Sequence, residues 1–392
     1  MESAHHFFKW NDLESEPGIF DSTFIAHNLG AVNWVYPYYD LRVEMTIAIT
    51  NTVEKETPSD LIDTPYDDPL LIERFKIMLD TLFAHIPDVD LMVLNIGNET
   101  DILFGTNEDE YAAFGVFLDS IVPYAKSRYA DLYDKELTIG AIMTLHGLIS
   151  DDRGPLCAAL NERTDVISTT YYPLDFDFTM QDPEVVFEDF DALIEAYSDS
   201  EQLIYFSECG YASSETCNSS EEQQAHFFSN VFEAWDLHMD RIKYLTIFKL
   251  TDWTEADVIA FGEYYDIDDP IFLEYLRTLG VRDEFGDFKL AYDFILCELA
   301  ARDWCAVECD LTTTVSEEQE TIQFYPQPAI NQLSVSLNAN EIKEFTLFDQ
   351  TGRIVRTSSS SSMMLNQIPT GIYIANVLTP DGEIYREKVI IQ

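Results

Sequence analysis

Basic side chains are scarce in this chain, and this scarcity excludes several classes of partner. The 392 residues carry 22 Lys and Arg against 72 Asp and Glu, a formal charge of −50. A field of that sign repels phosphate backbones, anionic lipid and acidic polysaccharide, so nucleic acid is excluded as a partner. No apolar run reaches about 18 residues, which excludes a membrane-spanning helix. Gly and Pro number 15 each and 46% of the residues are hydrophobic, so a disordered or collagen-like chain is excluded as well.

Metal and cofactor signatures are also missing. The six cysteines form no Cys-x-x-Cys pair and no histidine stands at zinc-finger spacing, so we expect neither a metal nor a cofactor. No Gly-x-Gly-x-x-Gly follows a predicted strand, which disfavours a dinucleotide. Spacing alone brings Cys209 near Cys217 and Cys305 near Cys309, so local disulfides and reduced buried thiols are both consistent with the sequence.

Short apolar runs alternate with helix-period stretches over the first 300 residues. The seven predicted strands cover residues 5–10, 45–50, 91–97, 137–143, 166–172, 203–207 and 245–250. The predicted helices cover residues 70–86, 111–129, 183–197, 221–239, 270–279 and 289–301. This alternation predicts a parallel α/β fold, and both a (β/α)8 TIM barrel and an open doubly wound sheet fit it. Seven strands are one fewer than a barrel requires, so a barrel here would lack its first strand.

Charge and periodicity both change near residue 304. Residues 1–310 carry 17 basic and 63 acidic side chains, whereas residues 311–392 carry five and nine. A polar stretch predicts a linker at 305–320, between a barrel at 1–304 and a second domain at 321–392. In that domain short strands are separated by turns containing Pro and Gly, which predicts a small all-β sandwich. Its serine run at 358–362 is predicted to be a flexible hairpin tip.

Two glutamates stand where a parallel barrel places its catalytic groups, at the carboxyl ends of strands. Numbered as in a complete barrel, the fourth strand ends in Asn98 and Glu99, and the seventh ends in Glu208. Glycosidic cleavage needs such a pair, with one carboxyl protonated as an acid and the other ionised as a nucleophile. The sequence therefore predicts Glu99 and Glu208 as catalytic residues.

Further ring-bearing side chains end neighbouring strands and are predicted to bind substrate. Flat aromatic faces suit sugar rings, and their polar atoms can reach a carboxylate. The candidates are Trp10, His146, Tyr171, Tyr172 and Trp253. A plain structural role, in the core or in a loop, is an alternative for each of them.

Several segments resemble clan A glycoside hydrolases, most closely the family 53 endo-β-1,4-galactanases. They are residues 95–99 (Asn-Ile-Gly-Asn-Glu), 206–211 (Phe-Ser-Glu-Cys-Gly-Tyr), 165–173, 10–21 and 280–289. The resemblance implies a retaining hydrolase of a neutral β-linked polysaccharide, with Glu99 as acid/base and Glu208 as nucleophile. It also implies that Asn98 binds the sugar 2-hydroxyl and that Tyr171 or Tyr172 orients Glu208. No Arg ends the second strand, where many clan members have one, so a non-catalytic carbohydrate-binding or cell-surface protein is the alternative.

The C-terminal segment resembles the type A sorting domain of type IX secretion in Bacteroidota. The similarity runs in order through residues 324–329, 345–355, 368–373 and 387–391. It implies a secreted or surface-bound protein, here expected to be a monomer, with the type IX machinery and a polysaccharide as its partners. Such proteins carry an N-terminal export signal, and none is visible after Met1, so we expect the natural chain to begin earlier.

Overall fold

The computed structural model describes residues 3–304, 323–326, 328–336, 342–348, 353–366, 368–379 and 384–391. The chain divides into two compact units, Met1–Leu311 and Thr312–Gln392, and each is described by itself. The predicted linker at 305–320 lies outside the described residues.

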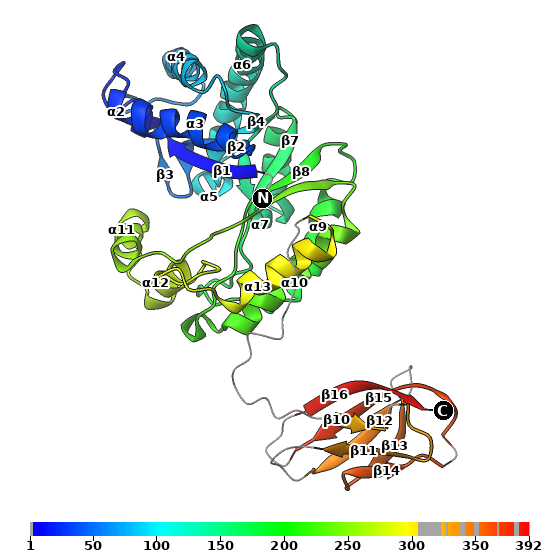
Figure 1. The fold of residues 1–392 in the computed structure, drawn as a ribbon. Coiled ribbons are helices and arrows are strands. Elements are labelled where there is room, and N and C mark those ends of the chain that lie inside the picture. The colour runs from blue at the N-terminus through cyan, green and yellow to red at the C-terminus, as the bar shows by residue number, and fades with distance from the viewer. Residues whose placement is uncertain are drawn as a thin grey trace. The chain divides into compact units, whose positions relative to one another are not determined.

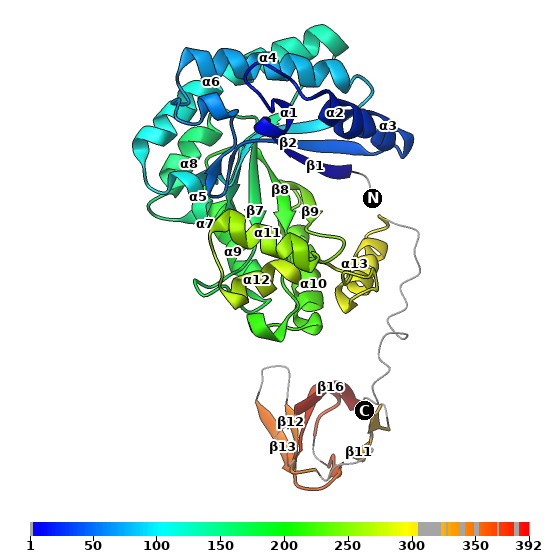
Figure 2. The ribbon, with the colours of Figure 1, turned by 90° about the vertical axis from the view of Figure 1, so that its left-hand side faces the viewer.

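All seven predicted strands of the first unit are confirmed, and the one predicted at 137–143 is divided into two short strands. Figures 1 and 2 show the strands with the helices around them. The strands are β1 (Ser3–Lys9), β2 (Arg42–Asn51), β4 (Leu91–Asn98), β5 (Ile139–Gly140), β6 (Ile142–Thr144), β7 (Val166–Tyr171), β8 (Leu203–Cys209) and β9 (Ile242–Ile247). One sheet runs β1-β2-β4-β5 and the other β6-β7-β8-β9, and only Ala141 separates β5 from β6. Within the described residues β1 pairs only with β2 and β9 only with β8. The barrel wall is therefore open between these two strands.

Helices alternate with these strands, and the six predicted ones are present with shifted ends. They are α4 (Pro69–His85), α6 (Glu108–Tyr133), α9 (Val185–Ala196), α10 (Glu221–Leu237), α12 (Pro270–Arg277) and α13 (Leu290–Ala301). Ser220 caps α10, since its hydroxyl accepts from the Gln223 amide (3.2 Å). Helix α9 begins two residues later than predicted, after Glu184.

The structure adds helices that the apolar pattern did not reveal. They are α3 (Gly30–Tyr38), α5 (Thr100–Phe104), α7 (Leu145–Ile149), α8 (Gly154–Asn161) and α11 (Glu255–Tyr265). Helix α11 buries only Val258, so its sequence carries almost no amphipathic signal. It belongs to the long segment after β9, residues 252–280, which we call the insertion. It lies beside α12 (Figure 1).

The inside of the barrel carries a polar layer in place of aliphatic side chains. Glu44 of β2 accepts from Asn95 of β4 (2.6 Å) and from Ser207 of β8 (2.5 Å). Asn95 in turn accepts from Ser168 of β7 (2.7 Å). All four side chains are buried, so these bonds offset their desolvation and tie four strands together across the interior.

The structure gives the state of four of the six cysteines. Cys209 and Cys217 are buried free thiols, as is Cys157, so of the two alternatives that the spacing left open the reduced one holds for Cys209 and Cys217. Cys297 on α13 is disulfide-bonded. Cys305 and Cys309 lie outside the described residues.

The second unit is a pair of antiparallel sheets, which confirms the predicted small β domain. One sheet has the order β10-β11-β14 and the other β13-β12-β15-β16. The strands are β10 (Gln323–Tyr325), β11 (Gln332–Ser336), β12 (Glu344–Phe348), β13 (Ile354–Ser358), β14 (Ser362–Met364), β15 (Gly371–Leu378) and β16 (Ile384–Ile391). The serine run joins β13 to β14, which lie in different sheets, so it is a connection between sheets and the predicted hairpin is wrong. Phe324, Leu333, Phe345 and Val389 are among the residues of the shared core.

The described part of the chain contains no helix that is both long enough and apolar enough to span a bilayer.

The polar layer should be sensitive to a single added methyl group. A Cβ at Gly140 would lie 2.3 Å from both Asn95 Oδ1 and Ser168 Oγ, so Gly140→Ala must break their hydrogen bond. We expect the change to lower the free energy of unfolding by about 1–3 kcal/mol. Urea unfolding followed by tryptophan fluorescence reports on this unit alone, because all five Trp residues precede residue 305.

Gly30→Ala is the matched control for this experiment. Gly30 begins α3, and an added Cβ would make only ordinary contact, 3.5 Å from the Ile25 carbonyl oxygen. Alanine in a helix should be neutral or stabilise the unit by up to about 1 kcal/mol. Equal unfolding midpoints for the two variants would contradict the role given to the polar layer.

Candidate active site

The end of β4 turns sharply and carries Glu99 into the barrel mouth. Gly97 has φ +87°, and a Cβ there would lie 2.7 Å from Thr50 Oγ1 and 2.8 Å from Thr100 Oγ1, so only glycine fits. Glu99 itself has the left-handed backbone (φ 46°, ψ 43°) that precedes α5. A non-glycine residue in this region is strained, which is a feature of functional sites.

Two threonine hydroxyls hold the Glu99 carboxylate. Thr52, just after β2, donates to Glu99 Oε2 (2.7 Å), and Thr170 of β7 donates to Glu99 Oε1 (2.7 Å). Burial raises the pKa of Glu99, and the negative charge of Asp101 adds to this, while the two hydrogen bonds oppose it. Glu99 is therefore a carboxyl group that takes up a proton more readily than an exposed one.

Glu208 comes from β8 and lies in register with Thr170 of the neighbouring strand. The Tyr172 hydroxyl donates to Glu208 Oε2 at 2.6 Å. Burial raises the pKa of Glu208 to about 8, and the charge of Glu99 is the next largest cause. The charge of Glu44, in the polar layer, raises it further. The structure thus brings the two predicted carboxyl groups within electrostatic reach of each other.

Neither carboxylate has an ion-pair partner within the described part of the chain. Glu99 is held by hydroxyls of Thr52 and Thr170, and Glu208 by the hydroxyl of Tyr172. Two like charges in one buried site repel each other unless a proton is shared between them. The charge of Glu99 accordingly raises the pKa of Glu208, so the site favours a proton on one of the two carboxyl groups.

Asn98 lies beside the pair with one polar atom unused. Its Nδ2 donates to Asn51 Oδ1 (3.0 Å), and Asn51 stands opposite Asn98 in the sheet. Its Oδ1 is buried and has no hydrogen-bond partner among the residues that the structure describes. A buried acceptor without a partner is unfavourable, so this atom is suited to a ligand hydroxyl.

Two of the predicted substrate-binding residues face away from the mouth, so those predictions are wrong. The Tyr171 hydroxyl donates to Asp189 of α9 (2.7 Å), because Tyr171 points into the helix layer while Tyr172 points inward. Trp10 is 0% exposed, donates from Nε1 to Glu14 (3.0 Å) and packs edge-on against Phe75 of α4. Both rings belong to the core.

His146 and Trp253 each lie beside another aromatic ring. The His146 ring lies 6.4 Å from the Tyr171 ring. Trp253 packs against Phe261 of α11 and has Lys249 Nζ over its ring. Burial lowers the pKa of Lys249 to about 8. Substrate contact by His146 and Trp253 stays a prediction.

Four further residues at the mouth were missed by the sequence argument. Thr52 and Thr170 hold Glu99, and Tyr265 and Tyr275 of the insertion lie near both carboxylates. Burial, followed by the charge of Glu99, raises the pKa of both tyrosines, and the charge of Glu208 contributes as well. Thr170 was inside a predicted strand and thus within reach of the pattern, whereas nothing in the sequence places the insertion.

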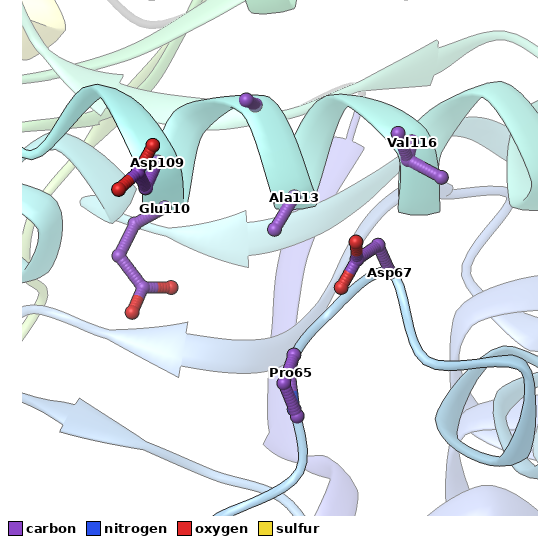
Figure 3. Close-up of a pocket in the computed structure, with 7 residues that line it drawn as sticks. Pro65, Asp67, Asp109, Glu110, Ala113 and Val116 are labelled. Atoms are coloured by element: carbon purple, nitrogen blue, oxygen red, sulfur yellow. The ribbon is translucent and has the colours of Figure 1, made fainter.

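A separate surface hollow holds none of the residues predicted from the sequence (Figure 3). It lies between the first half of α6 and the segment before α4. Its lining is Pro65, Asp67, Asp109, Glu110, Ala112, Ala113 and Val116. The described residues show no cluster of His, Cys, Asp or Glu that could hold a metal ion.

The comparisons with known proteins assign the second unit and the fold of the first. Residues 323–392 match the family model of the secretion system C-terminal sorting domain. No curated protein matches the sequence. Among solved structures, an exo-β-1,4-mannosidase of an Opitutaceae bacterium is 16% identical with a TM-score of 0.58, covering 77% of this chain and 53% of its own. This chain thus spans about half the length of that enzyme.

Two further relatives are GH5_18 proteins, both solved with Manβ1-4GlcNAc. That of Bifidobacterium longum is 16% identical with a TM-score of 0.59, covering 79% of this chain and 71% of its own. That of Streptomyces cattleya is 14% identical with a TM-score of 0.60, covering 84% and 75%. At such identities the likeness establishes a glycoside-hydrolase type of barrel fold, which agrees with clan A. The expected proximity to family 53 stays a prediction.

The hydrogen bond between Tyr172 and Glu208 gives a test of the site geometry. In Tyr172→Phe the ionised form of Glu208 loses its donor, so the pKa of Glu208 should rise further. A hydrogen bond to a charged group contributes about 1.5–3 kcal/mol, which corresponds to a shift of about 1–2 pKa units. Carbon-13 NMR of labelled glutamate carboxyls would measure the shift.

Tyr171→Phe is the matched control, since the neighbouring tyrosine loses a hydroxyl that binds Asp189 instead. The titration of Glu208 should stay unchanged in this variant. Equal shifts in the two variants would show that Tyr172 does not act on Glu208 directly.

Proposed function

We propose that the first unit is a retaining glycoside hydrolase that cleaves a neutral β-linked polysaccharide. The carrying observation is the half-buried pair of carboxyl groups, Glu99 and Glu208, at the carboxyl ends of β4 and β8. Such a pair performs the two-step displacement of retaining enzymes. The glycosidase-type barrel of the structural relatives supports this proposal.

In the first step Glu208 attacks the anomeric carbon while Glu99 gives its proton to the departing oxygen. The bond between the sugar and the leaving group breaks, and a glycosyl ester forms on Glu208. In the second step Glu99 takes a proton from water, whose oxygen displaces Glu208 from the same carbon. Asn98 Oδ1, the buried acceptor without a partner, is placed to accept from a substrate hydroxyl.

The hydrogen bonds of the pair fit these roles. Thr52 and Thr170 can accept a proton from Glu99 as well as donate to it, because hydroxyls do both. They therefore tolerate Glu99 in its acid form and in its ionised form. Tyr172 stays a donor, since burial and the charge of Glu208 raise its pKa well above the ordinary value. Its donation favours ionised Glu208, the nucleophile.

Net charge and the relatives suggest the substrate. A charge of −50 repels acidic glycans but leaves neutral ones unaffected. The relatives include an exo-β-1,4-mannosidase and proteins solved with Manβ1-4GlcNAc, so β-mannosides are the first substrates to test. We also propose that the sorting domain sends the protein through the type IX machinery to the cell surface or the medium.

A carbohydrate-binding protein without catalysis is the second candidate. It is favoured by the missing cation: no ion pair reaches Glu208 in the described residues, and the pKa of Glu208 is raised to about 8. A nucleophile that is largely protonated at neutral pH reacts slowly. Saturable sugar binding without turnover, unchanged in Glu208→Gln, would support this candidate.

Loss of either carboxylate should abolish turnover. We expect Glu99→Gln and Glu208→Gln each to lower kcat by a factor of about 10³ or more, as removal of a group that acts in the transition state does. Reducing-sugar release from mannan, galactan, glucan and xylan measures this. Glu201→Gln, at an exposed position before β8, is the control and should retain full activity.

Azide rescue separates the two glutamates. Added azide should restore turnover of an activated aryl glycoside by Glu99→Gln, because a small anion needs no general base, and the product is a glycosyl azide. Full activity of both glutamine variants would overturn the proposed mechanism.

The pH profile follows from the shared proton. The pKa of Glu208, raised to about 8, marks the loss of a proton from the pair as the pH rises. We therefore expect kcat/KM to fall as the pH rises through about 8, because Glu99 no longer has a proton to give. It should also fall on the acid side, where a second proton neutralises Glu208. A profile flat from pH 6 to pH 10 would contradict the shared proton.

A further inference from the structure

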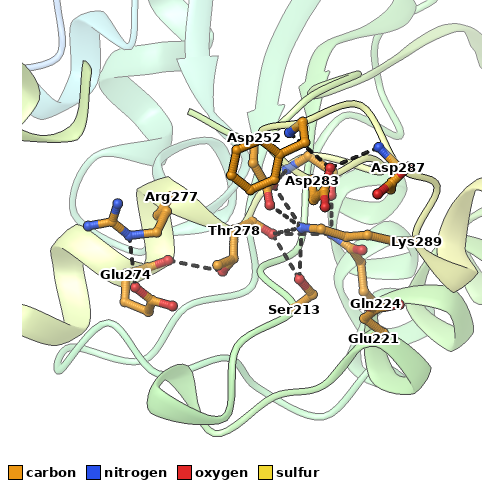
Figure 4. Close-up of polar contacts among 12 residues, drawn as sticks. Ser213, Glu221, Gln224, Asp252, Glu274, Arg277, Thr278, Asp283, Asp287 and Lys289 are labelled. Carbon is orange, nitrogen blue, oxygen red and sulfur yellow. Dashed lines mark hydrogen bonds and ion pairs between the residues drawn. The ribbon is translucent and has the colours of Figure 1, made fainter. Parts of the chain in front are cut away.

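The insertion after β9 crosses the barrel mouth and is fixed at its base. Lys289, only 6% exposed, donates to Asp252 (2.7 Å), to Ser213 Oγ (3.0 Å) and to the Thr278 carbonyl oxygen (3.3 Å), as Figure 4 shows. Asp252 stands at the start of the insertion and Thr278 at its end. Gly280 closes the base, since a Cβ there would lie 2.3 Å from the Asp252 amide nitrogen. One buried ammonium group therefore holds both ends of the segment together.

The outer part of the insertion reaches the β2 side of the mouth. The Tyr264 hydroxyl, at the end of α11, lies 2.9 Å from Glu56 Oε1 and 2.8 Å from the Asn51 carbonyl oxygen, and it accepts from Asn51 Nδ2 (3.0 Å). Lys9 Nζ lies over the Tyr264 ring at 4.4 Å and pairs with Glu56 (2.6 Å). Residue 264 is thus anchored to the ends of β1 and β2.

The same insertion also packs on the β7 and β8 side. Phe272 of α12 packs against Phe178 in the loop after β7, with ring centroids 4.8 Å apart. The Tyr275 ring lies 6.1 Å from that of Tyr172, the partner of Glu208. Between these two anchors, Tyr265 packs on Phe272 (5.3 Å) near both catalytic carboxylates. The insertion forms a bridge over the carboxyl pair, from the β2 side to the β8 side.

We infer that this bridge, residues 252–280, restricts cleavage to the ends of polysaccharide chains. The inference rests on the proposed hydrolase function and deepens it. A chain cut in its middle must lie across the mouth with sugars on both sides of the scissile bond. A bridge anchored at Asn51 and Glu56 on one side and at Phe178 on the other obstructs that path. A chain end needs only one open side, so it can enter between the bridge and the barrel.

The first test compares end-blocked substrates. Two oligosaccharides of the β-glycan that the wild-type protein hydrolyses, mannan being tried first, are blocked at the reducing or at the non-reducing end. Chain-end cleavage predicts that one of the two blocks lowers the rate by a factor of about 10² or more. The viscosity of the polymer should stay nearly constant while small sugars accumulate. Equal rates on both blocked substrates, with an early drop in viscosity, would overturn the inference and leave the hydrolase proposal intact.

The second test opens the bridge. Tyr264→Ala removes the ring beneath Lys9 and the hydroxyl at Asn51 and Glu56, and it should raise the ratio of internal to terminal cuts by a factor of about ten. Tyr124→Ala is the matched control: Tyr124 of α6 also carries a lysine over its ring, Lys76 at 5.4 Å, and its hydroxyl also donates to a carboxylate. The control should keep the wild-type ratio.

The outcomes separate this inference from the proposed function. An unchanged ratio in folded Tyr264→Ala would show that the bridge does not select chain ends. If the wild-type protein releases no sugar from any glycan or aryl glycoside, the hydrolase proposal fails and this inference fails with it. Circular dichroism of both variants verifies that they are folded.

Discussion

Two carboxyl groups share one half-buried mouth, and the described residues give neither of them an ion-pair partner. Much of the first unit can be understood as a response to that constraint. Burial of a charge is unfavourable by several kcal/mol unless hydrogen bonds or a proton compensate it. Here the compensation comes from hydroxyls of Thr52, Thr170 and Tyr172. They belong to segments at β2 and β7, and the two carboxyl groups belong to the ends of β4 and β8. These four strand ends must therefore keep their register for the pair to persist. The polar layer beneath, with Glu44 at its centre, ties the same strands together.

The bridge lies close to the same pair. Tyr265 and Tyr275 lie near both carboxylates, and burial is the largest cause of the raised pKa of Glu99 and of Glu208. In the proposed hydrolase this burial would strengthen the electrostatic interactions between a sugar and the pair. The same segment would then also limit the access of the substrate. Its buried base at Lys289 keeps that segment in place.

The sequence predicted the parts of the site that depend on strand order. Glu99 and Glu208 follow apolar runs whose positions in the wall could be counted, and the structure places both at the mouth. The choice between Tyr171 and Tyr172 depends on which face of β7 each occupies. The inward residues alternate without interruption from Ser168 and Thr170 to Tyr172, because the extra residue at the register shift lies in β8. Every residue of β7 is buried, so the apolar pattern did not show which of the two alternating sets faces the interior.

Residues positioned by tertiary contacts were beyond the reach of the pattern. Trp10 looked like a strand-end aromatic, but its helix turns it onto Phe75, a contact far away in the sequence. Helix α11 buries one side chain and carries no apolar stripe, so the sequence did not reveal it. Helix α12 of the same bridge was predicted, but nothing in the pattern placed it over the mouth. The anchor of α11, Tyr264, contacts Asn51 across 213 residues. Such pairs are defined by the closed fold and not by local periodicity.

The charges on the surface and the charges in the mouth act over different distances. Surface charges are screened beyond about 10 Å at 0.1 M salt, whereas charges within a buried site are screened far less. The shift of Glu208 accordingly has local causes: burial first, then the charges of Glu99 and Glu44. The many exposed carboxylates around them therefore repel acidic glycans at a distance without setting the proton on the pair. Discrimination by charge and the chemistry of cleavage are thus separated in space, so either can change without altering the other.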